Sequence, residues 1–115
     1  MAGPIQQINR YSSFRALTIA ISTSASDAFD AREFAAFGVV IPAAFTGTTI
    51  TLQVSADNVT YQALHKNSSD VAWSITVQVS KSYALPTDLE AWPFFKIVSG
   101  GTEAAARTLY VVGKG

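Results

Sequence analysis

Apolar and polar residues alternate along much of this chain. Residues 49–55, TITLQVS, place isoleucine, leucine and valine on one side and hydroxyl or amide groups on the other. A strand with one buried face has this period of two. Asp57 and Asn58 follow; aspartate folds back onto nearby backbone N–H groups, and asparagine tolerates a positive φ. We therefore predict a β-hairpin over residues 49–64 that turns at these two residues.

The same alternation predicts further strands on both sides of the hairpin. It runs over residues 15–23 and, most regularly, over residues 73–79. An apolar run at 39–41 ends at Pro42, because proline has no N–H to donate to a central sheet. Shorter apolar segments predict three more strands, over 82–85, 94–99 and 107–113.

Three segments need separate interpretation. Residues 26–37 contain candidate capping residues and good helix formers, but their alternating charged residues also suit an edge strand, which we favour. Pro86 favours a single helical turn over residues 87–91, because proline fits the first position of a helix. Residues 82–85 are expected to pair back on residues 73–79.

These elements predict an all-β protein with a single domain. The strands are short, recur at intervals of about 8–12 residues and have one apolar face each, which favours an antiparallel β-sandwich or jelly roll. No helical segment is long enough to connect parallel strands. We predict seven or eight strands over residues 15–115, preceded by an N-terminal arm, residues 1–14, that orders against a neighbouring molecule.

Charge and composition narrow the classes of partner. Charged residues make up 14% of the 115 residues, and eight basic and eight acidic side chains cancel to a net charge of zero. No basic patch indicates binding to nucleic acid or to an anionic membrane, and a neutral surface favours association. Without cysteine, disulfides and thiolate metal sites are excluded. No apolar run predicts a signal peptide or a membrane span, so synthesis in a host cytoplasm is expected.

The residues that carry chemistry are few. His65 is the only histidine, and the acidic residues lie mostly in predicted turns without forming a pair. Oxygen ligands for calcium gather in two adjacent loops, but their spacing matches no known calcium loop; they are Asp57, Asn58, Asn67 and Asp70. We expect no enzymatic activity, no catalytic residue, no bound metal and no cofactor.

Aromatic residues give a second line of interpretation. Trp73 shares its strand face with Ile75 and Val77, so it is expected in the core. Trp92 and Phe94 flank a proline in a connection, where aromatic side chains serve subunit contacts. If several aromatic rings, Tyr83 among them, lay on one concave face, they would form a platform for stacking sugars. A carbohydrate-binding module on a phage fibre or tail is therefore the alternative function.

Four segments carry a resemblance to a known family. They are GVVIPAAF at 38–45, ITLQVSAD at 50–57, FKIVSG at 95–100 and ARTLYVV at 106–112. In this order they resemble small β-sandwich virion proteins encoded by tailed bacteriophages. The resemblance implies a capsid decoration, or cement, protein that is often a homotrimer and stabilises the shell from outside. The family has no catalytic residues to transfer.

From this resemblance we expect the protein on the capsid surface of a virion, with the major capsid protein as its partner. No contact with nucleic acid or membrane is expected. The N-terminal arm and the aromatic connection are the candidate contact regions, because both place apolar side chains where a neighbour reaches them. The residues predicted to bind the partner are Ile5, Tyr11, Phe14, Trp92 and Phe94.

Overall fold

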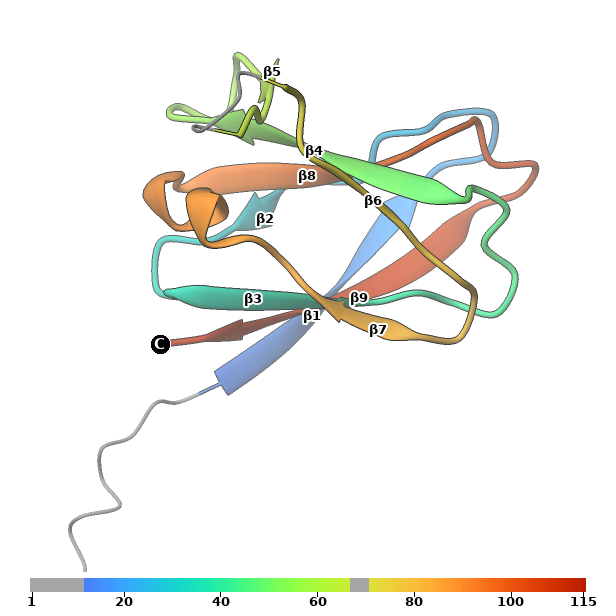
Figure 1. Ribbon diagram of the computed structural model, residues 1–115, viewed down its shortest axis with the longest axis horizontal. Coiled ribbons are helices and arrows are strands. Elements are labelled where there is room, and N and C mark those ends of the chain that lie inside the picture. The colour runs from blue at the N-terminus through green and yellow to red at the C-terminus, as the bar shows by residue number, and fades with distance from the viewer. Residues whose placement is uncertain (1–11, 67–70) are drawn as a thin grey trace, which may run out of the picture.

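Two antiparallel sheets pack face to face in the computed structural model (Figure 1), which describes residues 12–66 and 71–115. Sheet A has the strand order β1 (Ser12–Ile19), β9 (Arg107–Lys114), β3 (Ala36–Val40) and β7 (Ser82–Ala84). Sheet B has the order β2 (Phe29–Asp30), β8 (Phe94–Ser99), β4 (Thr49–Ser55) and β5 (Gln62–Ala63), with β6 (Ser74–Thr76) also paired to β4. The predicted all-β sandwich is confirmed.

The connections decide how the two sheets are joined. The chain crosses from one sheet to the other at every connection except those that link β4, β5 and β6. Between β7 and β8, a 3-10 turn that we label η2 (Thr87–Ala91) follows Pro86, as predicted. In the described residues, no helix has the length and apolarity that crossing a membrane requires.

The core lies between the sheets and is built from their alternating residues. At one end, three phenylalanines from different strands meet. The Phe29 and Phe95 rings stack with their centroids 5.0 Å apart, and Phe37 from sheet A meets Phe95 edge-on at 5.3 Å. All three are buried, and each such side chain contributes about 1.5–3 kcal/mol through removal of its surface from water. Trp73 is buried in this core, as predicted.

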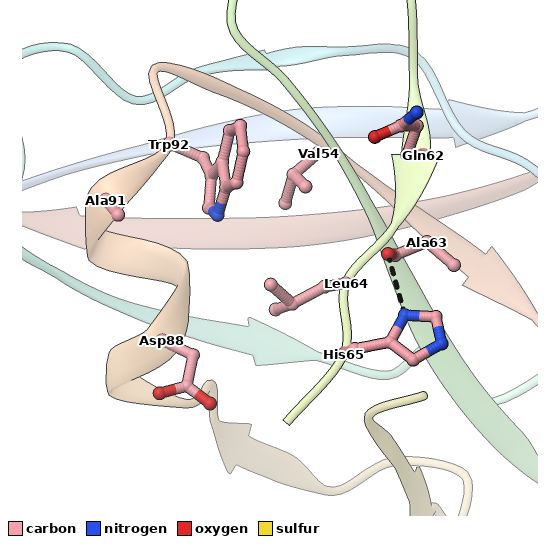
Figure 2. A pocket seen from close by; sticks show the side chains of 8 residues that line it. All are labelled: Val54, Gln62, Ala63, Leu64, His65, Asp88, Ala91 and Trp92. Atoms are coloured by element: carbon pink, nitrogen blue, oxygen red, sulfur yellow. Dashed lines mark hydrogen bonds between the residues drawn. The ribbon is translucent and has the colours of Figure 1, made fainter. Parts of the chain in front are cut away.

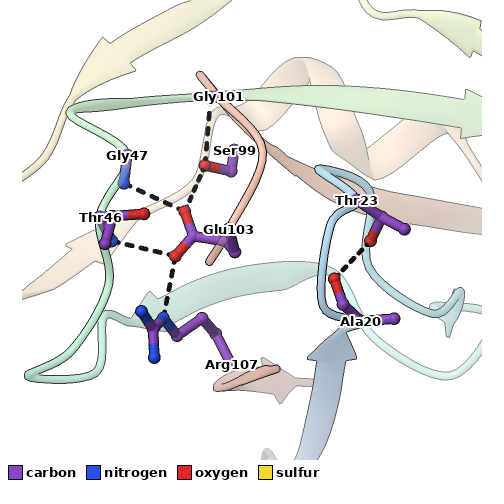
Figure 3. Close-up of polar contacts among 8 residues, drawn as sticks. All are labelled: Ala20, Thr23, Thr46, Gly47, Ser99, Gly101, Glu103 and Arg107. Carbon is purple, nitrogen blue, oxygen red and sulfur yellow. Dashed lines mark hydrogen bonds and ion pairs between the residues drawn. The ribbon is translucent and has the colours of Figure 1, made fainter. Parts of the chain in front are cut away.

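The opposite end of the sandwich is held by a buried carboxylate, that of Glu103 (Figure 3). Its Oε1 accepts hydrogen bonds from the Thr46 backbone N–H at 3.0 Å and from Arg107 Nε at 3.0 Å. Its Oε2 accepts from the Gly47 N–H at 3.1 Å and from the Ser99 hydroxyl at 2.9 Å. Glu103 thereby joins the β3–β4 connection to the β8–β9 connection.

The backbone of Glu103 also forms hydrogen bonds with the β1–β2 connection. Its carbonyl oxygen accepts from the Ser22 N–H, and its own N–H donates to the Thr23 carbonyl, both at 2.9 Å. Burial alone would raise the pKa of the Glu103 carboxyl. The hydrogen bonds from Thr46, Ser99 and Arg107 outweigh burial and lower this pKa to about 2. The side chain is therefore ionised at neutral pH, and three connections between the sheets meet on it.

The structure differs from the prediction in the length of the strand over residues 73–79 and in its pairing with residues 82–85. Residues 73–79 were expected to form one long strand, but β6 covers three of them and Val79 is 47% exposed. β6 runs antiparallel to β4 and its Thr76 pairs with Thr49, the first residue of β4, so the chain leaves sheet B after residue 76. Residues 82–84 then pair with β3 of sheet A, and the expected pairing with 73–79 is wrong.

The first part of the chain also departs from the prediction in detail. The strand expected over 15–23 is β1, which begins three residues earlier, at Ser12, and ends at Ile19. Ile21, expected on its apolar face, is 60% exposed in the following turn. Within 26–37 the edge-strand interpretation is confirmed by β2, which has two residues, and that segment contains no helix. Residues 1–11 of the predicted arm lie outside the described residues.

Glu103 yields a prediction about acid stability. The folded-state pKa lies near 2, below the ordinary 4.5, so its contribution is complete above about pH 4.5 and is lost as the pH falls toward 2. We expect Glu103→Gln to lower the free energy of unfolding by about 3 kcal/mol at about pH 7. In urea denaturation the gap to the wild type should shrink at about pH 2.5. Glu90→Gln, on the exposed surface, is the control, and an equal gap at both pH values would contradict the assignment.

Candidate functional site

The outward-facing side of sheet A is apolar across all four strands. We define the outer face of sheet A by two rows of paired residues. Strand register places Phe14, Val112, Gly38 and Ala84 in one row and Ala16, Tyr110, Val40 and Ser82 in the next. Phe14 is 66% exposed, Tyr110 44% and Val112 36%, and the rings of Phe14 and Tyr110 meet edge-on with centroids 5.8 Å apart. Large apolar side chains are thus presented together to the surroundings.

A hollow interrupts this apolar surface. Its volume is about 220 Å³, and it opens beside Gly38, Ala84 and Val112, with Lys114 at its end. A Cβ added at Gly38 would meet only the Tyr83 carbonyl oxygen, at an ordinary 3.4 Å, so packing within the chain leaves this space free. The outer face therefore has a projecting ring at Phe14 and a recess next to it in the same row.

The outer face carries little charge. The side chains of its two rows are apolar or hydroxyl groups, and the charged Lys114, at the end of β9, lies beside them and lines the hollow. Contact with another surface then removes few ions from water, which avoids the main cost of burying polar surface. An exposed apolar surface with little charge has the character of a contact surface for another macromolecule.

The residues predicted to bind a partner are dispersed by the fold. Phe14 lies on the outer face of sheet A, while Ile5 and Tyr11 lie outside the described residues. Trp92 follows η2 and Phe94 begins β8 in sheet B, so neither joins Phe14. The prediction missed Tyr110 and Val112, although their alternation with Leu109 and Val111 places them on the outward side.

The aromatic platform of the alternative function is not assembled. The Arg32 guanidinium lies over the Phe94 ring, 5.1 Å from its centroid. The Tyr83 hydroxyl accepts a hydrogen bond from the Gln78 N–H at 2.8 Å, and its ring packs on the core. Trp92 alone among these aromatic residues lines a pocket, which opens between β5 and η2.

The predicted hairpin turn is confirmed, and the Asp57 carboxylate accepts hydrogen bonds from the backbone of the turn. Asp57 Oδ1 accepts hydrogen bonds from the Val59 and Thr60 N–H groups at 2.9 and 3.0 Å. The Ser55 hydroxyl accepts from the Asn58 N–H at 2.9 Å, and Asn58 has a φ of 65°. The backbone bonds from Thr60 and Val59 lower the pKa of Asp57. This carboxylate therefore shapes the turn.

The remaining candidates for chemistry stay apart. His65 is exposed, with its Nδ1 3.2 Å from the Ala63 carbonyl oxygen. Of the proposed calcium ligands, Asn67 and Asp70 lie outside the described residues. Within the described part of the chain, no group of three histidine, cysteine or acidic residues is placed to hold a metal ion. Glu103 was expected among the acids of the turns; it does lie in a connection but is buried.

Comparison with known proteins shows the fold alone. No protein-family model matches this chain, and no curated protein matches it. The crystal structure of the SPBc2 prophage-derived protein YomS is similar, with a TM-score of 0.60 over 91% of this chain and 96% of that one. The two sequences are 14% identical, so the likeness establishes a shared sandwich.

The exposure of the outer face predicts that its most exposed aromatic residue, Phe14, has no part in holding the fold together. Phe14→Ser should change the free energy of unfolding by less than about 1 kcal/mol, because it loses only an exposed cross-strand contact. Phe95→Ala, in the core, should cost about 3–5 kcal/mol. Urea denaturation of both variants provides the measurement. A cost for Phe14→Ser equal to that of Phe95→Ala would show that Phe14 is part of the core.

Proposed function

We propose that this protein is a structural component of a tailed-phage particle, a decoration or cement protein that binds the outside of the major capsid lattice and stabilises it. The observation that carries the proposal is the outer face of sheet A. It is an exposed apolar surface beside the Lys114 cation, and packing within the fold does not bury it. The likeness to a prophage-derived protein supports a phage origin. The resemblance of the four sequence segments to virion proteins supports the same role.

The geometry suits attachment without chemistry. Strands lie about 4.8 Å apart and rise about 3.4 Å per residue, so a face of four strands with eight, eight, five and three residues projects about 400 Å². A standard interface buries about 800 Å² on each partner. One face therefore gives a contact of modest strength whose side chains are already ordered by the sheet. On a lattice, copies that are linked to each other gain strength through avidity.

We propose that these linked copies form a homotrimer. Zero net charge leaves little electrostatic repulsion between copies, and closed symmetry lets three modest attachments act together. The trimer is a separate claim from the capsid contact, because the outer face of sheet A is assigned here to the capsid. The two claims therefore need separate measurements.

The capsid contact is tested with capsids that lack this protein. We expect Val112→Glu to weaken binding at least about tenfold, because the contact would have to remove the new carboxylate from water. Val59→Glu is the matched control: it is the same substitution at an 80% exposed valine on the hairpin turn, and its binding should equal that of the wild type. Co-sedimentation with capsids gives the affinities, and circular dichroism checks that each variant is folded.

Two outcomes would contradict these assignments in different ways. Equal capsid binding by Val112→Glu and Val59→Glu would show that another surface makes the contact. Wild-type protein that does not bind capsids, or density confined to the tail in a virion reconstruction, would reject the decoration function itself.

Oligomeric state is tested on the purified protein. We expect a sedimentation-equilibrium mass of about three times 12.2 kDa. Dilution should dissociate the trimer in a single step, because closed symmetric assemblies lack partly filled states of comparable stability. A mass of one chain at all concentrations would contradict the trimer and leave the capsid contact to be judged by its own assay.

A further inference from the structure

A pocket of about 330 Å³ opens between β5 and η2, and its walls differ in character (Figure 2). Val54 and Leu64, each 5% exposed, form its apolar floor. Trp92 lies on the η2 side, and its indole ring is partly buried against the core. The polar groups belong to three residues at the rim, Gln62, His65 and Asp88.

We propose that this pocket binds one neutral hexose ring. Small-molecule pockets range from about 300 to 1,000 Å³, so this one takes a single ring and not an extended chain of sugars. A pyranose has an apolar face of C–H groups and an edge of hydroxyl groups. Val54, Leu64 and the Trp92 ring offer apolar surface to the first, and the rim offers hydrogen bonds to the second.

The polar groups of the rim are available to a ligand. Among the described residues, the side-chain oxygens of Asp88 and Gln62 have no hydrogen-bond partner in the chain. Asp57 and Glu103, in contrast, use their carboxylates on backbone N–H groups. His65 keeps Nδ1 near the Ala63 carbonyl oxygen, and its ring lies on the side of its backbone away from Trp92 and Asp88 (Figure 2), so Asp88 and Gln62 are the groups that meet a sugar hydroxyl.

The charge of the pocket selects the class of sugar. Asp88 brings a carboxylate, and the described lining residues include no lysine or arginine. A uronic acid or a sugar phosphate would meet this carboxylate without a compensating cation. A neutral hexose meets only groups that accept or donate hydrogen bonds, so it is the class that fits.

This site is independent of the proposed capsid contact. The pocket lies on β4 and β5 of sheet B and on η2, whereas the capsid contact is assigned to the outer face of sheet A. Both surfaces are open in one molecule, and each is measured without the other. Failure of capsid binding leaves the sugar site standing, and the reverse also holds.

Tryptophan fluorescence provides the measurement, because the chain has two tryptophans in different places. Trp73 is buried in the core, and Trp92 borders the pocket. The full-length protein is titrated with glucose, galactose, mannose and N-acetylglucosamine, with glucuronic acid as the acidic comparison. We expect a saturable change in emission with at least one neutral sugar, at a Kd of about 1 mM or below. Trp92→Phe should abolish this change while binding remains visible by ligand-observed NMR.

A matched pair of variants on η2 locates the site. Asp88→Ala should weaken binding about tenfold by removing a hydrogen-bond acceptor for a sugar hydroxyl. Glu90→Ala removes an exposed carboxylate from the same turn, outside the lining, and should bind like the wild type. The proposal is overturned if no neutral sugar gives a saturable response, if the two variants weaken binding equally, or if glucuronic acid binds as tightly as the neutral sugar that binds best.

Discussion

The sandwich depends on the buried carboxylate of Glu103. Apolar contact between two sheets has little directionality, so the core alone permits the sheets to slide past each other. Glu103 fixes their relative position because its oxygens bind Thr46 and Gly47 in the β3–β4 connection, Ser99 at the end of β8 and Arg107 at the start of β9. A buried ion adds less stability than a well-packed apolar residue would. We infer that its role here is to fix one arrangement of the three connections that meet at this end.

Because the fold is secured from inside, its surfaces are free for other contacts. The carboxylates of Asp57 and Glu103 are occupied by backbone N–H groups. Two described surfaces remain available, an apolar face with a recess on sheet A and a small pocket beside sheet B that has apolar and polar walls. The first suits a large, repeated partner surface, and the second suits a small ligand. A rigid scaffold that carries two such surfaces can attach to a particle and still present a binding site outward.

The sequence was informative wherever local pattern decides the structure, as in the hairpin turn at Asp57, the turn after Pro86, and strand β8, which covers the predicted residues. It failed where the outcome depends on distant residues. The alternation of 73–79 continues past residue 76, but β6 ends there because its partner β4 begins at Thr49, opposite Thr76. The ligands of Glu103 at Thr46 and Gly47 lie 57 and 56 residues away, so nothing local predicts its burial. Phe14 was predicted as a contact, but the recess beside it appears only when strands distant in sequence are paired.

The lengths of the edge strands bear on how copies of this protein meet. A chain without net charge lacks the long-range repulsion that keeps many proteins from adding strand to strand. The two sheets have four edges. Two of them are β2 and β7, with two and three residues, and a third is shared by the short strands β5 and β6. The long edge, β1, is covered near its end, where the Asp27 carboxylate accepts from the Thr18 N–H at 3.2 Å. Three of the four edges therefore offer crowded copies few open backbone groups, so strand-to-strand growth at these edges is disfavoured.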